Sequence, residues 1–160
     1  MTCCTSVRIL SAVMLIGAIS QAAFAQAPAA PAPQALTYEM AAQAIDAAEA
    51  EARKNNWNVT IVVADAAGVP VMLRRLNGAS ARSYDIAMRK AATVVASKLT
   101  TAEYGVQVKA KTVTEVPNGI TFAGGVPMMR GSELIGAVGT SGVTAAQDEI
   151  ISKAGAGAVK

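Results

Sequence analysis

The first candidates for a binding or catalytic site lie in a glycine-rich stretch, GGVPMMRGSELIGAVGTSG, at positions 124–142. A Walker loop needs a Gly-Lys-Ser/Thr ending, and a dinucleotide-binding turn needs G-x-G-x-x-G, and the stretch has neither. Ser141 lies in the segment GTSGVT, which lacks the G-x-S-x-G spacing of a nucleophile elbow. Phosphate binding and serine hydrolysis are therefore not supported.

Two interpretations of this stretch remain open. Thr140, Ser141 and Gly142 lie between a predicted strand and a predicted helix, where free backbone N–H groups can hold a carboxylate. Alternatively, Ser141 or Thr144 only caps that helix. The other glycines are expected to serve packing, by allowing a bend at Gly124 and Gly125 and the close approach of layers at Gly136 and Gly139.

Histidine is absent from the whole chain. This excludes Ser-His-Asp triads, Cys-His dyads and any metal site with a histidine ligand. An acid, a base or a metal ligand must come from carboxylates, tyrosine, lysine, methionine, hydroxyl groups or the backbone.

The N-terminal segment predicts export. Residues 1–25 contain Arg8, an apolar run over 9–19 and the sequence Ala-Phe-Ala at 23–25, which together are typical of a cleaved secretory signal peptide. The apolar run is too short to span a membrane. Cleavage would remove both cysteines, Cys3 and Cys4, so the mature chain would have neither a disulfide nor a transmembrane segment. We therefore expect a periplasmic or secreted protein.

An Ala/Pro-rich tether follows at 26–35, and a single domain over 36–160 completes the chain. Without Arg8 the chain has thirteen basic and eleven acidic side chains, a net charge of +2, with no basic run longer than Arg74-Arg75. Nucleic-acid binding is not expected from this charge distribution.

Periodicity and capping residues predict the order of elements in the domain. Thr37 and Ser80 are the expected N-caps of the first two helices. Apolar residues on both faces of the first strand place it at the centre of its sheet. Hairpins dominate, which predicts an α+β domain with a mostly antiparallel, five-stranded sheet flanked by helices. The predicted elements are helices over 37–54 and 80–98, a short helical turn near 101, strands over 59–63, 69–76, 120–125, 126–130 and 133–141, and a helix from about 144.

Two segments carry a family resemblance that spans the domain from Leu36 to Gly155. RRLNGASARSYDIAMRKAATVV, followed about thirty residues later by FAGGVPMMRGSELIGAVGTSGVTAAQDE, resembles the GlcG/HbpS-like family, which includes the C-terminal domain of some PduO-type proteins. The resemblance implies a profilin-like fold, assembly into homo-oligomers from dimers to octamers, and haem binding in several exported members. The chain departs from the family at Asn77, where aspartate is common, and at Val143, where a second glycine is common.

The resemblance makes haem the first candidate ligand, although some haem-binding members use a histidine that this chain lacks. Tyr84 is the expected iron ligand, because tyrosinate is a precedented axial ligand. It also lies on the apolar stripe of its helix, where a core role is the alternative. Met128 and Met129 are weaker candidates, and strand alternation should bury one of them. The residues expected to contact the cofactor are Tyr84, Arg89, Lys90, Gly124, Gly125, Met128, Thr140, Ser141 and Gly142, with Arg89 and Lys90 pairing with the propionates.

Two other functions remain open. The protein could be an enzyme that acts on a small organic acid, with Arg89, Lys90 and the GTSG turn holding the carboxylate and Asp148 or Glu149 acting as base. It could also be a non-catalytic accessory or signalling protein whose functional parts are its oligomer surfaces.

Overall fold

The computed structural model describes Met1 and residues 35–159. The predicted signal peptide, apart from Met1, and all of the predicted tether except Ala35 lie outside these residues. Within them, none of the helices is both long enough and apolar enough to cross a membrane.

Four helices form where the sequence supplies N-caps and apolar stripes. They are α1 (Tyr38–Lys54), α2 (Ala81–Ser97), α3 (Thr101–Lys109) and α4 (Ala145–Gly157). The hydroxyls of Thr37, Ser80 and Thr144 accept hydrogen bonds from backbone N–H groups in the first turns of α1, α2 and α4. The two expected caps are confirmed, and Thr144 rather than Ser141 caps the last helix.

Four strands form one antiparallel sheet in the order β2-β1-β4-β3. They are β1 (Thr60–Asp65), β2 (Pro70–Arg75), β3 (Gly125–Arg130) and β4 (Glu133–Ser141). As expected from its apolar faces, β1 is central, and the α+β class is confirmed.

The predicted fifth strand, over 120–125, is wrong: within residues 35–159 the sheet has four strands, and 120–124 is a loop. Side chains of α2 bind the backbone at and just before the start of this segment. The N–H of Ile120 donates to the Thr93 hydroxyl at 2.9 Å, and Arg89 donates twice to the carbonyl of Asn118. The contact of Ile120 takes up one backbone donor that a strand ladder would use, and Arg89 holds the chain just before the segment.

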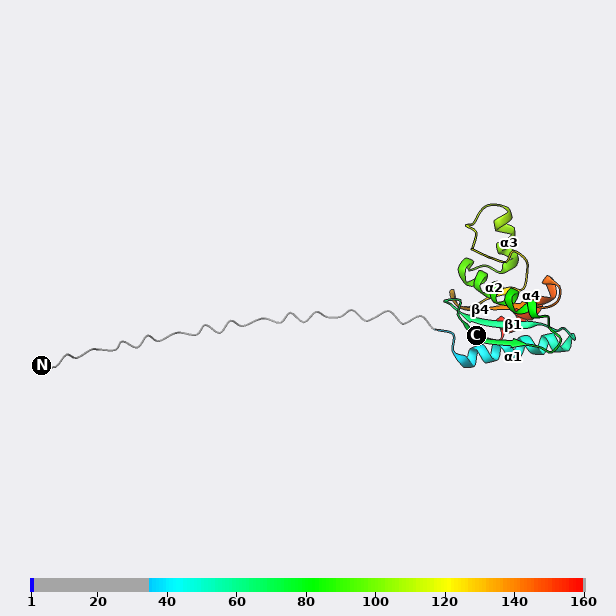
Figure 1. Cartoon of the computed structure of the whole chain (residues 1–160), viewed down its shortest axis with the longest axis horizontal. Coiled ribbons are helices and arrows are strands. Elements are labelled where there is room, and N and C mark those ends of the chain that lie inside the picture. Colours follow the sequence, from blue (N-terminus) through cyan, green and yellow to red (C-terminus); the bar gives the residue numbers. More distant parts are fainter. Residues whose placement is uncertain (2–34, 160) are drawn as a thin grey trace. The chain divides into compact units, whose positions relative to one another are not determined.

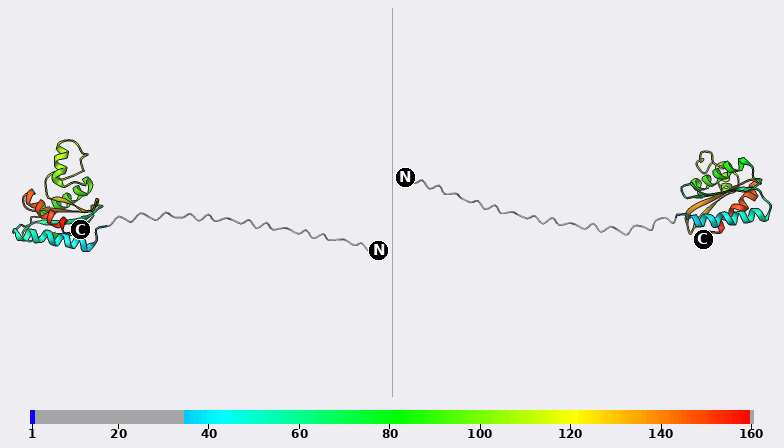
Figure 2. Two further views of the ribbon diagram at one scale, coloured as in Figure 1. Left: turned by 180° about the vertical axis from the view of Figure 1, so that it is seen from behind. Right: turned by 60° about the horizontal axis from the view of Figure 1, so that its bottom comes forward.

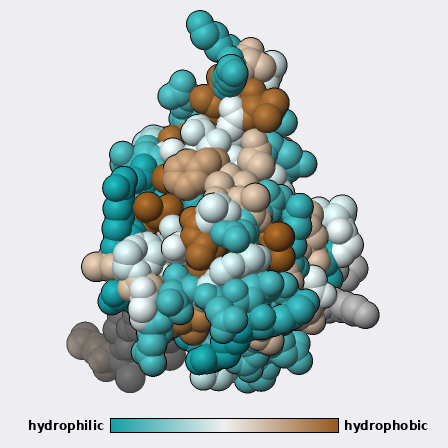
Figure 3. All heavy atoms as spheres, turned by 90° about the vertical axis from the view of Figure 1, so that its right-hand side faces the viewer, coloured by the Kyte–Doolittle hydropathy of each residue, from teal (hydrophilic) through white to brown (hydrophobic). Residues whose placement is uncertain are grey.

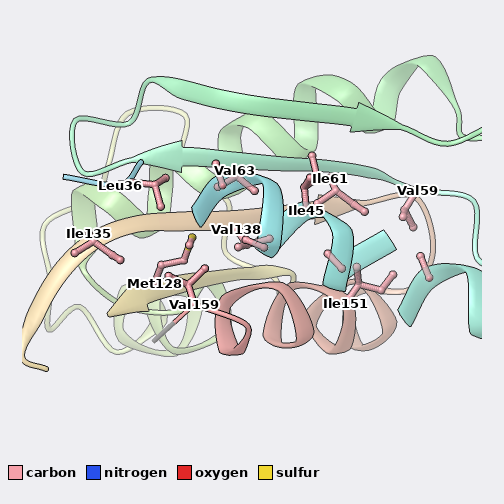
Figure 4. Packing of buried hydrophobic residues seen from close by; sticks show 14 of the residues in the cluster. Leu36, Ile45, Val59, Ile61, Val63, Met128, Ile135, Val138, Ile151 and Val159 are labelled. Atoms are coloured by element: carbon pink, nitrogen blue, oxygen red, sulfur yellow. The ribbon is translucent and has the colours of Figure 1, made fainter. Parts of the chain in front are cut away.

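The helices cover both faces of the sheet (Figures 1 and 2). α1 and α4 pack together on one face, while α2 crosses β4, β1 and β3 on the other. Figure 4 shows Ile45 of α1 and Ile151 of α4 close to Ile61 and Val138 of the sheet in the larger core. The smaller core lies between α2 and the sheet, and α2 does not cover β2.

Glycine lets α2 approach the sheet closely. A Cβ atom on Gly139 of β4 would lie 2.3 Å from the carbonyl oxygen of Ala87, and one on Gly125 of β3 would lie 2.9 Å from that of Lys90. The helix backbone therefore rests almost directly on the strands. This close contact fixes the position of the buried residue Lys90 relative to the sheet.

Candidate functional site

A buried ion pair joins α2 to α4. The ammonium of Lys90 donates to the Asp148 carboxylate at 2.8 Å and to the carbonyl of Thr140 at 2.8 Å. The two side chains are 0% and 3% exposed. The Phe122 ring lies over the ammonium, with its centroid 5.0 Å from Nζ, at the distance of a cation–π contact.

The turn after β4 holds a carboxylate, as one interpretation of the sequence proposed, but that carboxylate belongs to the chain itself. The backbone N–H groups of Gly142 and Val143 donate to Asp148, the latter at 3.2 Å. Because Asp148 lies in the first turn of α4, it also faces the positive end of the helix dipole. The N–H groups of the turn are therefore already bound to the side chain of Asp148.

Hydroxyl groups complete this network and leave no room in it. Ser152 donates to the carbonyl of Gly124 at 2.9 Å and shares a 2.8 Å hydrogen bond with the Thr140 hydroxyl. Gly124 has φ of +120°, and a Cβ atom there would lie 2.3 Å from the Lys90 ammonium. Every buried polar side-chain atom in the described residues has a hydrogen-bond partner. We call this network of Lys90, Gly124, Thr140, Gly142, Asp148 and Ser152 the latch. It is filled by its own side chains and is not a pocket.

Burial shifts the pKa values of Lys90 and Asp148 in the latch. Desolvation lowers the pKa of Lys90, against the opposing effect of Asp148. Desolvation also raises the pKa of Asp148, although Lys90 and the two backbone N–H groups oppose this shift. Because both shifts favour neutral forms, the pair depends on its mutual contact to remain charged.

Five of the sequence-predicted site residues meet at this latch: Lys90, Gly124, Thr140, Gly142 and Asp148. Ser141 lies buried beside them at the end of β4, and Gly125 packs against α2. Arg89 lies elsewhere, bound to Asn118 and 3.6 Å from Asp85. Lys90 and Arg89, which the sequence predicted to pair with haem propionates, are therefore a buried lysine and an arginine bound to a loop.

Tyr84 lies apart from the latch and is 50% exposed, so the expectation of a core role is wrong. The buried face of α2 runs through Ser83, Ala87, Ala91 and Val94, and Tyr84 lies beside that face. Tyr84 is therefore at the surface, and it lines none of the hollows found among the described residues.

The two methionines of β3 point to opposite sides of the sheet. Met128 is 1% exposed in the larger core, whereas Met129 is 43% exposed. This confirms that alternation buries one of the pair. Met128 therefore faces the larger core and not the hollow that Met129 lines.

Met129 lines a hollow of about 520 Å³ between the end of α2 and the β3–β4 hairpin. This volume lies within the range of small-molecule and cofactor sites. Apolar side chains and polar groups both contribute to its wall. The lining residues are Ala66, Val95, Lys98, Met129, Ser132, Glu133 and Leu134.

Sequence reasoning named only Met129 in this hollow. Lys98 could have been noticed, because it follows the apolar stripe of α2 by one turn from Val94 and Val95. Ser132 and Glu133 belong to a hairpin turn, and only the folded sheet brings that turn beside α2. Within residues 35–159, no cluster of three or more carboxylates, cysteines or histidines is arranged to hold a metal ion.

The chain is similar to proteins with known structures and names. Protein GlcG of Escherichia coli K12 is 36% identical over 108 residues, which cover 66% of this chain and 81% of GlcG. A double mutant of HbpS from Streptomyces reticuli has a TM-score of 0.75 at 30% identity, covering 85% of this chain and 94% of that one. A PduOC:haem complex has a TM-score of 0.67 at 28% identity, covering 79% and 96%.

The sequence model of a family described as "Haem degrading protein HbpS-like" matches residues 36–157. This match covers every helix and strand of the described domain. The chain therefore belongs to the HbpS-like family.

Proposed function

We propose that this protein is an exported haem-binding protein. The observation that carries the proposal is the family of the chain, which is described as haem-degrading, together with the haem complex among its structural relatives. The hollow of about 520 Å³ beside Met129 is the largest of the four hollows described in this domain.

The hollow by itself does not enclose a haem group. Val95 and Leu134 offer apolar surface, and Lys98 offers a cation. Because Lys98, Met129, Ser132 and Glu133 are all exposed, a porphyrin bound there would remain largely in water. The support for haem binding is therefore the family of the chain.

Haemin titration tests the proposal. Adding haemin to the purified protein should shift and sharpen the Soret band and saturate at a fixed ratio of haem to chain, because a specific site gives one environment. Bovine serum albumin with its own bound haemin serves as a reference for non-specific apolar binding. A Soret spectrum that stays that of free haemin at equimolar protein would contradict haem binding.

The small-acid alternative receives no support from the geometry. The groups expected to hold and deprotonate an acid are Lys90, the GTSG turn and Asp148, and they are bound to one another in the latch. Arg89 is held by Asn118. We therefore propose no second function.

Export is part of the proposal and is supported by Arg8, the apolar run and the Ala-Phe-Ala sequence. The mature chain would begin at Gln26 and act in the periplasm or outside the cell. N-terminal sequencing of the exported protein checks this, and a functional protein that retains Met1 would contradict it.

Homo-oligomer formation, from a dimer to an octamer, is also proposed. Several large apolar side chains are exposed, among them Val69, Leu73, Tyr84, Val106, Phe122 and Ile150. Figure 3 shows hydrophobic residues gathered in a band on one face of the domain. Apolar surface of this kind supports association between copies. Light scattering gives the mass, and a monomer at micromolar concentration would contradict the proposal.

A further inference from the structure

We propose that Asn77 is a site of spontaneous modification, at which the side-chain amide is converted to a carboxylate through a cyclic imide formed with Gly78. The inference is independent of haem binding. It rests on the two Asn-Gly pairs of the chain, Asn77-Gly78 and Asn118-Gly119, which the fold places in different surroundings.

The reaction needs an asparagine followed by a residue whose backbone nitrogen is accessible. That nitrogen, after losing its proton to solvent, attacks the side-chain carbonyl carbon of the asparagine. A carbon–nitrogen bond forms and closes the imide ring, the bond to the amide nitrogen breaks, and ammonia leaves. Water, the only co-reactant, then opens the ring at either carbonyl and gives aspartate or isoaspartate. Glycine favours the attack because it has no Cβ atom to crowd its nitrogen and because its backbone is conformationally permissive.

Asn77 and Gly78 form the exposed centre of a tight turn. The N–H of Ala79 donates to the carbonyl of Leu76 at 3.1 Å, and Gly78 has φ of +84° whereas Asn77 has no positive φ, which is the pattern of a type II turn. The N–H of Gly78 takes no part in the hydrogen bond that closes this turn. Among the residues that the structure describes, neither that N–H nor the side-chain amide of Asn77 makes a hydrogen bond. Both reacting groups are therefore free to meet.

The surroundings of Asn77 supply water and a positive charge. Asn77 lines two surface hollows of about 210 and 370 Å³, whose walls include the polar side chains of Arg53, Asn58 and Arg75. Arg75 donates two hydrogen bonds to the carbonyl of Ala79, at 3.1 and 2.6 Å, which hold the end of the turn but not its central peptide. A cation in the same hollow favours the negative charge that develops on the attacking nitrogen and on the attacked carbonyl.

The second Asn-Gly pair is held in place by the fold. The N–H of Gly119 donates to the carbonyl of Val116 at 2.8 Å, so the attacking nitrogen is occupied. The carbonyl of Asn118 accepts two hydrogen bonds from Arg89, at 3.0 and 2.9 Å. A Cβ atom on Gly119 would lie 3.0 Å from the Tyr104 hydroxyl, so this residue is also packed against α3. Cyclisation at Asn118 would first have to break these contacts.

Modification of Asn77 would change the connection between β2 and α2. Aspartate adds a negative charge to a hollow that contains Arg53 and to one that contains Arg75. Isoaspartate routes the main chain through the side chain and so adds a methylene group to the backbone, three residues before the Ser80 N-cap of α2. The site would therefore alter both the charge of this surface and the start of α2 as the protein ages.

The experiment follows tryptic peptides of the folded protein by mass spectrometry during incubation near neutral pH. Asn77 lies in the peptide 76–82 and Asn118 in the peptide 112–130, so the two sites are measured separately. We expect Asn77 to be converted at least about fivefold faster than Asn118, because a backbone hydrogen bond must open before Asn118 can react. Incubation in heavy-oxygen water should place one labelled oxygen atom in the product, and isoaspartyl methyltransferase should label the isoaspartate fraction.

Incubation in urea is the matched control, because it removes the fold and keeps both Asn-Gly pairs. The two rates should converge there. Asn77→Gln keeps an amide at the site and should leave the peptide 76–82 unmodified, since the longer side chain closes a ring much more slowly. Equal rates in the folded protein, or faster conversion of Asn118, would contradict the proposal. An Asn77 that stays intact in the folded protein but reacts in urea would also overturn it, by showing that the turn protects the amide.

Discussion

Replacing Lys90 by methionine should lower the free energy of unfolding by about 3–5 kcal/mol, the usual cost of removing one partner of a buried ion pair. Methionine has a similar length, so the cavity is small. The loss comes from Asp148, whose carboxylate would stay buried without its cation, and from the carbonyl of Thr140, which would lose a donor. Urea denaturation followed by circular dichroism measures the change.

Lys153→Met is the matched control. Lys153 also pairs with a carboxylate at 2.8 Å, that of Glu149, but its side chain is 62% exposed. An exposed helical pair contributes less than about 0.5 kcal/mol. Equal losses in Lys90→Met and Lys153→Met would show that burial does not determine the strength of the latch.

The double variant Lys90→Met/Asp148→Asn separates the ion pair from the shape of its site. Asparagine keeps an oxygen for the N–H of Val143 and removes the unpaired charge. The double variant should therefore be more stable than Lys90→Met alone. A double variant that is less stable would assign the loss to packing instead of charge.

The Lys90→Met variant should also become pH-dependent. Burial raises the pKa of Asp148, and Lys90 opposes this rise, so removing Lys90 raises the pKa further. A folded-state pKa above the unfolded value of about 3.9 means that the folded variant binds the proton more tightly. Its deficit in stability relative to the parent should therefore shrink as the pH falls from about 7 toward about 4. A deficit that stays constant over this range would contradict the assignment.

Local signals in the sequence predicted most of the fold. The caps at Thr37 and Ser80, the central position of β1 and the antiparallel hairpins depend on contacts between near neighbours or on strand patterns, and the structure confirms them. The prediction of a fifth strand failed where Thr93 binds the N–H of Ile120 and Arg89 binds the carbonyl of Asn118 just before the segment, both from about thirty residues earlier in the chain. Strand propensity cannot report such distant side-chain contacts.

The prediction of the candidate site was also limited by contacts between residues that lie far apart in the sequence. Lys90 lies three residues after Ala87 and four before Val94, on the buried stripe of α2, so its burial was readable from the spacing. Its partner is 58 residues away, and no spacing rule connects them. The hollow beside Met129 combines the end of α2 with a hairpin turn, and it exists only once the sheet and α2 have packed together.

Gly139→Ala tests that packing, because the added methyl group has no space. Gly139 has no positive φ, so alanine causes no backbone strain, and its effect is purely steric. The Cβ atom would lie 2.3 Å from the carbonyl oxygen of Ala87 and 2.8 Å from the nitrogen of Ala91, which are backbone atoms that cannot rotate away. Overpacking of this kind costs about 1–3 kcal/mol or more, so we expect a loss near or above the upper end of that range.

Moving α2 away from the sheet would also change the hollow beside Met129, although Gly139 does not line it. Gly157→Ala is the matched control, since a methyl group added at this residue, at the end of α4, would have no atom within 4 Å. Alanine there should raise the free energy of unfolding by up to about 1 kcal/mol, through the lower entropy of the unfolded chain. Urea denaturation curves of both variants measure the two changes in the free energy of unfolding. If Gly139→Ala matched Gly157→Ala in stability, α2 would not rest on β4 as closely as the structure places it.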